Sequence, residues 1–500
     1  MPESAGIVSP EIEVPELALS PTAGQSLVRG ALVYGVTNFG LKGLNFGLVV
    51  LYTRFLTPAD FGTVALAEIV ASVMAAVSSL GLTSALQPLY FSYMSEPILQ
   101  RRCVSSLIRF AAATTMVVLL LSLLSGMVLP PGAGFRIAFY PYIAIALCTG
   151  SALQLNDYRL VLYQLEERPL SYSMLAVACF GFTSSATVYR VILLHGGGLG
   201  LLVGKLTGAV LTVCLAAWLG RRWLSGGWEK SFVIEALPIA LPLVPHLLLA
   251  LGLVAADRLI LQHYRSMQEV GLYSLAYTLG TMMFLVTASV VQAWSPLFYR
   301  MAAQGQAQRV LTSRMLGAIL LLLGTVAVCG SAIAHPFIRG VLDSRYWAAE
   351  RIVPLVIGGY LFHAVFSLFQ LSALHARKAQ FVWTVSVLAL TINLVLNFAW
   401  DARWGMQGAA WATTIAYAVE GLLMYWYAQR VYKLPFRSSR LLLVLGVYVL
   451  LMAITQLSLP VATQTLATAG ASALALIALC VIGREDLGLL KNLFDPASAG

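Results

Sequence analysis

Residues 27–56 read LVRGALVYGVTNFGLKGLNFGLVVLYTRFL, and this stretch decides the fold. Apolar residues fill the interval from Arg29 to Arg54, which as a helix is long enough to cross the hydrocarbon core of a bilayer. Lys42 interrupts it thirteen positions after Arg29 and twelve before Arg54, so Lys42 lies about 18 Å from either charged end. Since a lysine stem cannot reach water over that distance, we expect Lys42 to face a cavity or a partner within the protein.

Three other polar residues lie on the same face of this predicted helix. Tyr34, Asn38, Lys42 and Asn45 are spaced by four, four and three positions, which places them within an arc of about 80°. A cation binds phosphate, and amide and aromatic groups bind sugar, so we predict a substrate-binding stripe. The alternative is that the amides hydrogen-bond neighbouring helices and that the lysine neutralises a buried carboxylate such as Glu420.

The composition is that of a membrane protein. Hydrophobic residues make up 59% of the 500 residues, charged residues only 10%, and the mean hydropathy is +0.83. About a quarter of a soluble chain is charged. Apolar runs of about 20 residues recur along the whole length. We therefore predict an all-α polytopic membrane protein with about fourteen transmembrane helices.

The sequence also argues against several function classes. The net charge of +10 comes from basic residues scattered between apolar runs, so nucleic acid is not an expected partner. The six cysteines include no CxxC pair, and we expect no disulfide framework, metal site or cofactor. No connection between predicted spans exceeds about 15 residues, and no nucleophile–base pair or glycine-rich phosphate loop is evident. We therefore expect that the protein is not an enzyme.

Basic residues predict the orientation. With the N-terminus in the cytoplasm, the cytoplasmic side carries about twice as many Lys and Arg residues as the outer side, so both termini are expected there. Residues 1–26 contain four glutamates and no Lys or Arg, which is typical of a tail and not of a secretory signal.

The chain repeats itself. The segment TPADFG from Thr57 to Gly62 is echoed 209 positions later by SMQEVG from Ser266 to Gly271. Each pairs a hydroxyl residue with a carboxylate three positions on, as at the start of a helix with a capping box. A second echo relates small residues spaced by four, which let membrane helices approach closely. At an offset of 208, it matches Gly200, Gly204 and Gly208 with Gly408, Ala412 and Ala416.

The repeat predicts the domain organisation. We expect two homologous six-helix halves flanked by a tail and an extra helix pair. Because each half has an even number of spans, the halves are parallel, and the substrate site is expected between them near mid-membrane. The predicted segments are a cytoplasmic disordered tail (1–26), an N-terminal half (27–232), a C-terminal half (233–436), and the helix pair with the C-terminal tail (437–500).

Several motifs resemble a known family. RFLTPADFG, from Arg54, is similar to the first hairpin of the Wzx-type polysaccharide-biosynthesis flippases. DRLIL from Asp257, followed by EVGLY from Glu269, is similar to the start of their second half. NLVLN from Asn393 and GMQGAAWAT from Gly405 resemble their eleventh and twelfth helices. The likeness extends from residue 27 to about residue 432. It implies membership of the multidrug, oligosaccharidyl-lipid and polysaccharide exporter superfamily.

Two ionisable residues inside later spans are further candidates. Lys205 lies about two turns from the outer end of its span, where it either contributes to the substrate site or reaches water along the helix. Glu420 shares a face with Thr413 and Tyr417, and it either carries a coupling ion or neutralises a lysine.

Three other residues are candidates for ion coupling, namely Glu68, Asp257 and His246. For Asp257 the alternative is an interfacial ion pair with the adjacent Arg258. Three prolines near the start of the same span predict a kinked or broken helix there, and they are Pro238, Pro242 and Pro245.

The resemblance implies a flippase that moves a polyprenyl-pyrophosphate-linked oligosaccharide from the cytoplasmic to the periplasmic leaflet of the bacterial inner membrane. Its product would be a cell-surface polysaccharide such as O-antigen or exopolysaccharide, and its partners would include a polymerase and the export machinery. The alternative is a cation-coupled multidrug or metabolite exporter of the same superfamily, although Lys42 would repel cationic drugs. A membrane polysaccharide polymerase or ligase is less favoured, because it would be expected to carry a large external loop.

Overall fold

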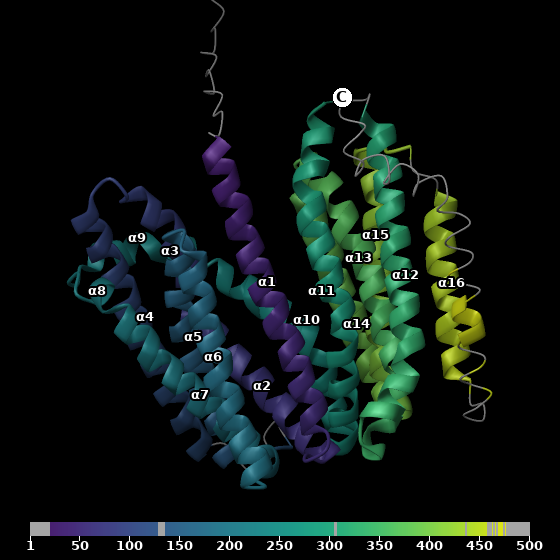
Figure 1. Ribbon diagram of the computed structural model, residues 1–500, viewed down its shortest axis with the longest axis horizontal. Coiled ribbons are helices and arrows are strands. Elements are labelled where there is room, and N and C mark those ends of the chain that lie inside the picture. The colour runs from purple at the N-terminus through teal and green to yellow at the C-terminus, as the bar shows by residue number, and fades with distance from the viewer. Residues whose placement is uncertain are drawn as a thin grey trace, which may run out of the picture.

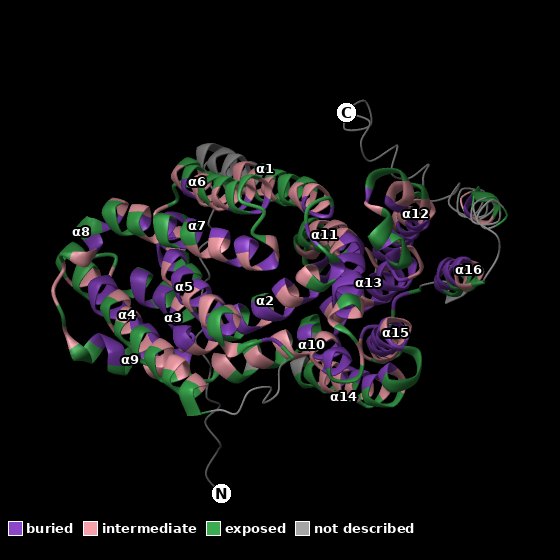
Figure 2. Ribbon diagram, turned by 90° about the horizontal axis from the view of Figure 1, so that it is seen from below, coloured by how far each residue is buried: buried purple, intermediate pink, exposed green. Residues whose placement is uncertain are grey.

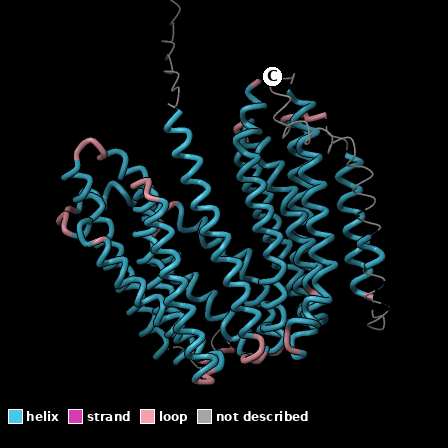
Figure 3. The backbone as a smooth tube through the Cα atoms, in the orientation of Figure 1, coloured by secondary structure: helices cyan, strands magenta, loops and turns pink. Residues whose placement is uncertain are grey.

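The computed structural model describes residues 21–128, 136–304, 308–435, 438–457 and 469–473, together with positions 463, 466 and 476. Within these residues every regular element is a helix (Figure 3). Pro58 and Pro169 stand at helix starts, where the missing N–H of proline has no cost.

The first half of the chain contributes the elements α1 (Pro21–Tyr52), α2 (Pro58–Ser79), α3 (Leu82–Ser92), α4 (Pro97–Val128), η1 (Phe139–Ile143), α5 (Ala144–Leu165), α6 (Pro169–Val188), η2 (Tyr189–Leu193), α7 (Gly197–Leu219) and α8 (Arg221–Leu224). The second half contributes α9 (Lys230–Ala240), α10 (Leu243–Tyr264), α11 (Met267–Ala303), α12 (Arg309–Val341), η4 (Ser344–Arg351), α13 (Val353–His375), α14 (Ala379–Trp404) and α15 (Met406–Val431). Beyond it lies α16 (Ser438–Gln456).

The helices are those of a polytopic membrane protein, as predicted. Among the described residues, eight helices are long and apolar enough to cross a membrane, and nine if the bent pair of α9 and α10 is one span. That pair is bent by 49°, which confirms the kink expected from the prolines. The count of fourteen stays a prediction. Most of residues 458–500, which include the second helix of the predicted C-terminal pair, lie outside the described residues, as do residues 1–20 of the predicted tail.

The helices gather in two groups, with α1 running between them (Figure 1). In this view the groups meet at the lower end and spread apart at the upper end, where α1 begins. We call the lower end the closed end. It contains the α1–α2 connection (53–57), the α10–α11 connection (265–266) and η4. The predicted topology places the closed end on the outer side of the membrane.

Helices α2 and α11 cross at two glycines, Gly62 and Gly271. A Cβ added to Gly62 would lie 2.2 Å from the backbone oxygen of Met267, and one added to Gly271 would lie 1.7 Å from that of Pro58. Only glycine lets the two backbones approach this closely. These are the last residues of the two echoed motifs, so each helix meets the other at the equivalent point.

Equivalent contacts recur on the two sides of this crossing. The full capping box forms at the start of α2, and at the start of α11 the side chain of Ser266 accepts a hydrogen bond from the N–H of Glu269. Asp60 of α2 also accepts a hydrogen bond from the N–H of Gly198 at the start of α7 (3.0 Å), and Glu269 of α11 accepts one from the N–H of Met406 at the start of α15 (3.3 Å). These paired contacts support the organisation in two halves, which stays a prediction.

The core lies where the two groups meet. One cluster of buried apolar residues extends from α2, α5 and α7 into α11, α12, α13 and α15. Figure 2 shows buried residues along α2, α11 and α13. In its most apolar stretch α13 is 89% buried, whereas α4 and α6 are 17% buried. Since most apolar side chains in these stretches of α4 and α6 are not buried within the protein, we expect much of their surface to face lipid.

Candidate functional site

A cavity of about 360 Å³ lies between the two groups of helices, just inside the closed end. Helices α1, α2, α6, α7, α10 and α11 contribute to its wall, so both predicted halves take part. The wall is unusually polar for the interior of a membrane protein. Its polar residues include Asn45, Glu68, Ser72, Lys205, Arg258 and Thr278.

Lys205 and Glu68 form an ion pair in this wall. Lys205 stands on α7 two turns after the helix start, and Glu68 faces it from α2. The side chains are 32% and 50% exposed, so both border the cavity. The lysine and the carboxylate therefore meet at the cavity surface, where a bound molecule could contact either of them.

Arg258 of α10 adds a second cation. Its guanidinium lies 4.4 Å from the centre of the Tyr277 ring, and it donates a hydrogen bond to the backbone oxygen of Val254 (3.0 Å). The alternative of an ion pair between Asp257 and Arg258 was wrong, because the described residues form none. Adjacent residues on a helix point about 100° apart. The cavity wall therefore carries two cations and one carboxylate.

The predicted stripe on α1 is divided between two surroundings. Tyr34 packs edge-on against Tyr172 of α6, with ring centres 5.0 Å apart, and the Tyr172 hydroxyl donates to Asn38 (3.4 Å). This end of the stripe makes helix contacts, as the alternative reading expected. Asn45 lines the cavity. Lys42 is exposed one turn before Asn45, and it has no hydrogen bond or ion pair within the described part of the chain.

Asp257 belongs to a buried polar cluster formed by α10, α11, α14 and α15. It is fully buried, and it accepts hydrogen bonds from the hydroxyls of Tyr273 and Thr413, the latter at 3.0 Å. Asn393 donates to Thr413 (3.1 Å), and Asn397 donates to Asn393 (3.0 Å). Among the described residues, one carboxylate oxygen of Asp257 and the amide oxygen of Asn397 have no hydrogen-bond partner. Buried oxygens without donors suit a proton or a small cation such as Na⁺.

Glu420 lies in a separate buried cluster. It is 1% exposed, its Oε2 lies 2.9 Å from Nδ1 of His363, and it accepts a hydrogen bond from Ser386 (3.0 Å). No lysine contacts Glu420 within the described residues, so its partner is a histidine and a hydroxyl. The sequence reasoning missed His363, although an ionisable residue inside an apolar span is itself a signal of function.

Two further points concern ion sites. His246 lies in α10, but its side chain is outside the described residues. Within the described residues, no three His, Cys, Asp or Glu side chains gather as a metal site.

The family of the chain follows from a comparison of its sequence. The family model described as "Polysaccharide biosynthesis protein" matches residues 27–302, more than half of the chain. The chain belongs to this family. No curated protein matches it. The family assignment confirms the resemblance to the polysaccharide-biosynthesis flippases.

Solved structures show the fold. "Lipid II flippase MurJ, inward closed conformation" is 14% identical with a TM-score of 0.69, and the match covers 91% of this chain and 99% of that one. An inward-facing multidrug resistance MATE family transporter of the MOP superfamily is 12% identical with a TM-score of 0.54, covering 81% and 94%. A point mutant of the Vibrio cholerae MATE transporter VcmN is 13% identical with a TM-score of 0.53, covering 81% and 96%. These structures are described as those of a flippase and two transporters, and the match shows that this chain shares their fold.

Proposed function

We propose that this family member is a flippase for a polyprenyl-pyrophosphate-linked oligosaccharide. It would move this lipid from the cytoplasmic to the periplasmic leaflet of the inner membrane, for export of an O-antigen or exopolysaccharide. The observation that carries the proposal is the polar cavity between the two groups of helices, with Lys205 and Arg258 in its wall. Lys42 is not among the lining residues, but it is exposed one helical turn before Asn45, which is.

The chemistry of such a substrate matches this cavity. The lipid tail can stay in the bilayer, whereas the pyrophosphate and sugars cannot cross the hydrocarbon without polar contacts. Pyrophosphate needs cations in surroundings of low dielectric constant, where charge–charge attraction is stronger than in water. Lys205 and Arg258 supply positive charge in the wall, and Asn45, Ser72 and Thr278 supply amide and hydroxyl groups for sugar.

Glu68 gives this site a resting state. With no anion bound, Glu68 pairs with Lys205 and limits the cost of a cation in the membrane. An arriving pyrophosphate would compete with Glu68 for the lysine and leave the carboxylate to take up a proton or to turn toward water. Substrate arrival would in this way be linked to a change of charge in the cavity wall.

The two buried clusters of the second half are the proposed coupling sites. Asp257 has an oxygen without a donor in a cluster of neutral oxygens, and Glu420 faces a histidine. Both acids lie away from the cavity lining, so they are suited to bind an ion and not the substrate. The coupling ion would be a proton or Na⁺, taken up on one side of the membrane and released on the other.

The proposed orientation has both termini in the cytoplasm and the closed end outside. A cysteine at Glu96, between α3 and α4, should then react with a membrane-impermeant thiol reagent only from the cytoplasm. A cysteine at Ser344, at the start of η4, should react only from outside. Labelling of both positions from one side would rule out this orientation.

Two observations favour a second candidate function, a cation-coupled multidrug exporter. The cavity wall contains a carboxylate, Glu68, and two of the similar structures are MATE transporters. The two cations of the wall oppose this reading, because they repel the cationic drugs that such exporters handle. The exporter would also need Glu68 and not Lys205 for transport.

Deletion of the gene tests the proposal. The expected result is loss of a surface polysaccharide and accumulation of its lipid-linked precursor on the cytoplasmic leaflet, identified by mass spectrometry. Complementation with the wild-type chain should restore export, and a Lys205→Ala chain present at equal level should restore much less of it. Normal polysaccharide together with increased drug sensitivity would favour the exporter instead.

A further inference from the structure

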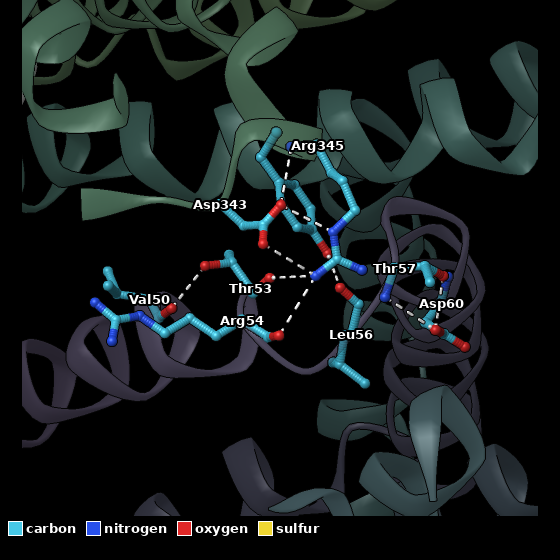
Figure 4. A network of polar contacts seen from close by, with 9 residues as sticks. Val50, Thr53, Arg54, Leu56, Thr57, Asp60, Asp343 and Arg345 are labelled. Atoms are coloured by element: carbon cyan, nitrogen blue, oxygen red, sulfur yellow. Dashed lines mark hydrogen bonds and ion pairs between the residues drawn. The ribbon is translucent and has the colours of Figure 1, made fainter. Parts of the chain in front are cut away.

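The two groups of helices are joined at the closed end by an arginine of η4. The guanidinium of Arg345 donates hydrogen bonds to the backbone oxygens of Thr53 and Arg54, each at 3.4 Å, just beyond the end of α1 (Figure 4). Asp343 accepts hydrogen bonds from the same guanidinium (2.8 and 3.3 Å) and fixes its direction. The Arg345 guanidinium also holds the pKa of the Asp343 carboxyl below its usual value.

A second arginine makes the reverse connection. Arg136, just before η1 of the first half, donates hydrogen bonds to the backbone oxygens of His263 (2.9 Å) and Arg265 (3.0 Å), at the end of α10. Its own backbone N–H donates to the side chain of Gln262 (3.1 Å). Arg345 of the second predicted half therefore contacts the end of α1 in the first half. Arg136 of the first half contacts the end of α10 in the second half.

The two connections are equivalent by the internal repeat. Arg136 and Arg345 are 209 positions apart, and so are their acceptors Arg54 and His263. This is the offset that relates the motifs at Gly62 and Gly271. The residue after each arginine is buried and anchors it, and these residues are Ile137 and Tyr346. The contact of Arg136 with His263 thus matches the contact of Arg345 with Arg54, with each residue 209 positions from its counterpart. Two unrelated surface contacts would not be expected to match in this way.

The acceptors explain why arginine suits these positions. The last carbonyls of a helix have no partner within the helix, and the helix dipole places partial negative charge there. The oxygens of Thr53, Arg54, His263 and Arg265 accept no other backbone hydrogen bond among the described residues. A planar guanidinium can bind two such oxygens together, which a lysine cannot do in the same way.

We propose that Arg136 and Arg345 are a matched pair of latches that hold the closed end shut, one at each seam between the two groups of helices. This inference rests on the proposed transport function only in one respect: a carrier that releases substrate at this end must break both contacts. The two latches act in parallel on one interface. Loss of one leaves the other in place, whereas loss of both frees the closed end.

Access to the cavity from the closed end tests the proposal. Ser274 lines the cavity, is 4% exposed and lies two turns after the start of α11. A Ser274→Cys chain in the membrane of intact spheroplasts would be treated with an impermeant thiol reagent, and labelling of the chain without this cysteine would be subtracted. We expect about threefold faster labelling in Arg136→Gln or Arg345→Gln, and about tenfold in the double variant. Arg→Lys at both positions should fall between the wild type and the double Gln variant.

Arg190 provides a matched control. It lies at the start of η2 on the same predicted side, is exposed, and makes no side-chain hydrogen bond or ion pair with the described residues. Arg190→Gln should leave labelling of Ser274→Cys unchanged. Unchanged labelling in the double variant, with the protein inserted at normal level, would overturn the latch. Because labelling needs no substrate, this result is distinct from a failure of the proposed function, which would appear as normal polysaccharide in the deletion strain.

Discussion

The ion pair of Lys205 and Glu68 allows a double-mutant test of substrate binding. If Lys205 binds the pyrophosphate, Lys205→Ala removes a charged hydrogen-bond donor from the site. Such a contact contributes about 1.5–3 kcal/mol, and the lower figure applies because the side chain is 32% exposed. Transport at low substrate concentration should then fall about tenfold. The folding cost should be below about 1 kcal/mol, since the Glu68 side chain left alone is 50% exposed.

The assay would compare four chains: wild type, Lys205→Ala, Glu68→Gln and the double variant. Flipping would be measured in proteoliposomes with a fluorescent polyprenyl-pyrophosphate saccharide, and stability by thermal melting of the purified proteins. We expect normal melting and about tenfold slower flipping for Lys205→Ala, with no recovery in the double variant. Glu68→Gln alone should bind substrate at least as tightly as the wild type. Recovery of flipping in the double variant would refute the binding role, because it would show that Lys205 only neutralises Glu68.

Other predictions concern residues outside this pair. The Lys42→Ala protein should insert into the membrane normally yet export little polysaccharide, whereas Lys42→Arg should keep partial export. Normal export by Lys42→Ala would show that Lys42 is not part of the site. Glu420→Gln or Asp257→Asn should keep the protein folded but abolish the effect of an imposed proton or Na⁺ gradient on vesicle transport, and an unchanged gradient effect would exclude the residue from coupling. Gly271→Ala should lower stability by about 1–3 kcal/mol, measured as thermal melting, because its Cβ meets the backbone of α2; Gly181→Ala, with open space around it, should not.

Much of the fold could be predicted from the sequence, because it depends on local properties. Apolar length predicts spans, hydroxyl–carboxylate spacing predicts the caps of α2 and α11, and prolines predict the bend between α9 and α10. The structure shows N-cap hydrogen bonds at both helix starts and the bend, and eight of the described helices are long and apolar enough to be spans. The count of fourteen spans stays a prediction, because part of the chain lies outside the described residues and eight or nine described spans meet the requirements of length and composition.

The candidate site was only partly predictable, because it depends on which helix faces meet. Lys205 and Glu68 were each singled out, but nothing in their spacing of 137 positions indicates that they pair. Asp257 and Arg258 are the reverse case, because they are adjacent in the sequence but do not pair in the described structure. Neighbours in the sequence were expected to pair, yet they point into different surroundings, one buried and one on the cavity. His363 was overlooked because its partner Glu420 comes from a different helix.

The internal repeat suggests how the two halves divide the work. At equivalent positions the first half has Glu68 and Lys205, whereas the second half has Tyr277 and Thr413. The first half thus has an ion pair on the cavity wall where the second has neutral hydroxyls. Conversely Asp257, which Thr413 helps to hold, stands where the first half has Leu48. Under the proposed function this difference would let the substrate bind at the charged site of one predicted half and the coupling ion at the buried acid of the other.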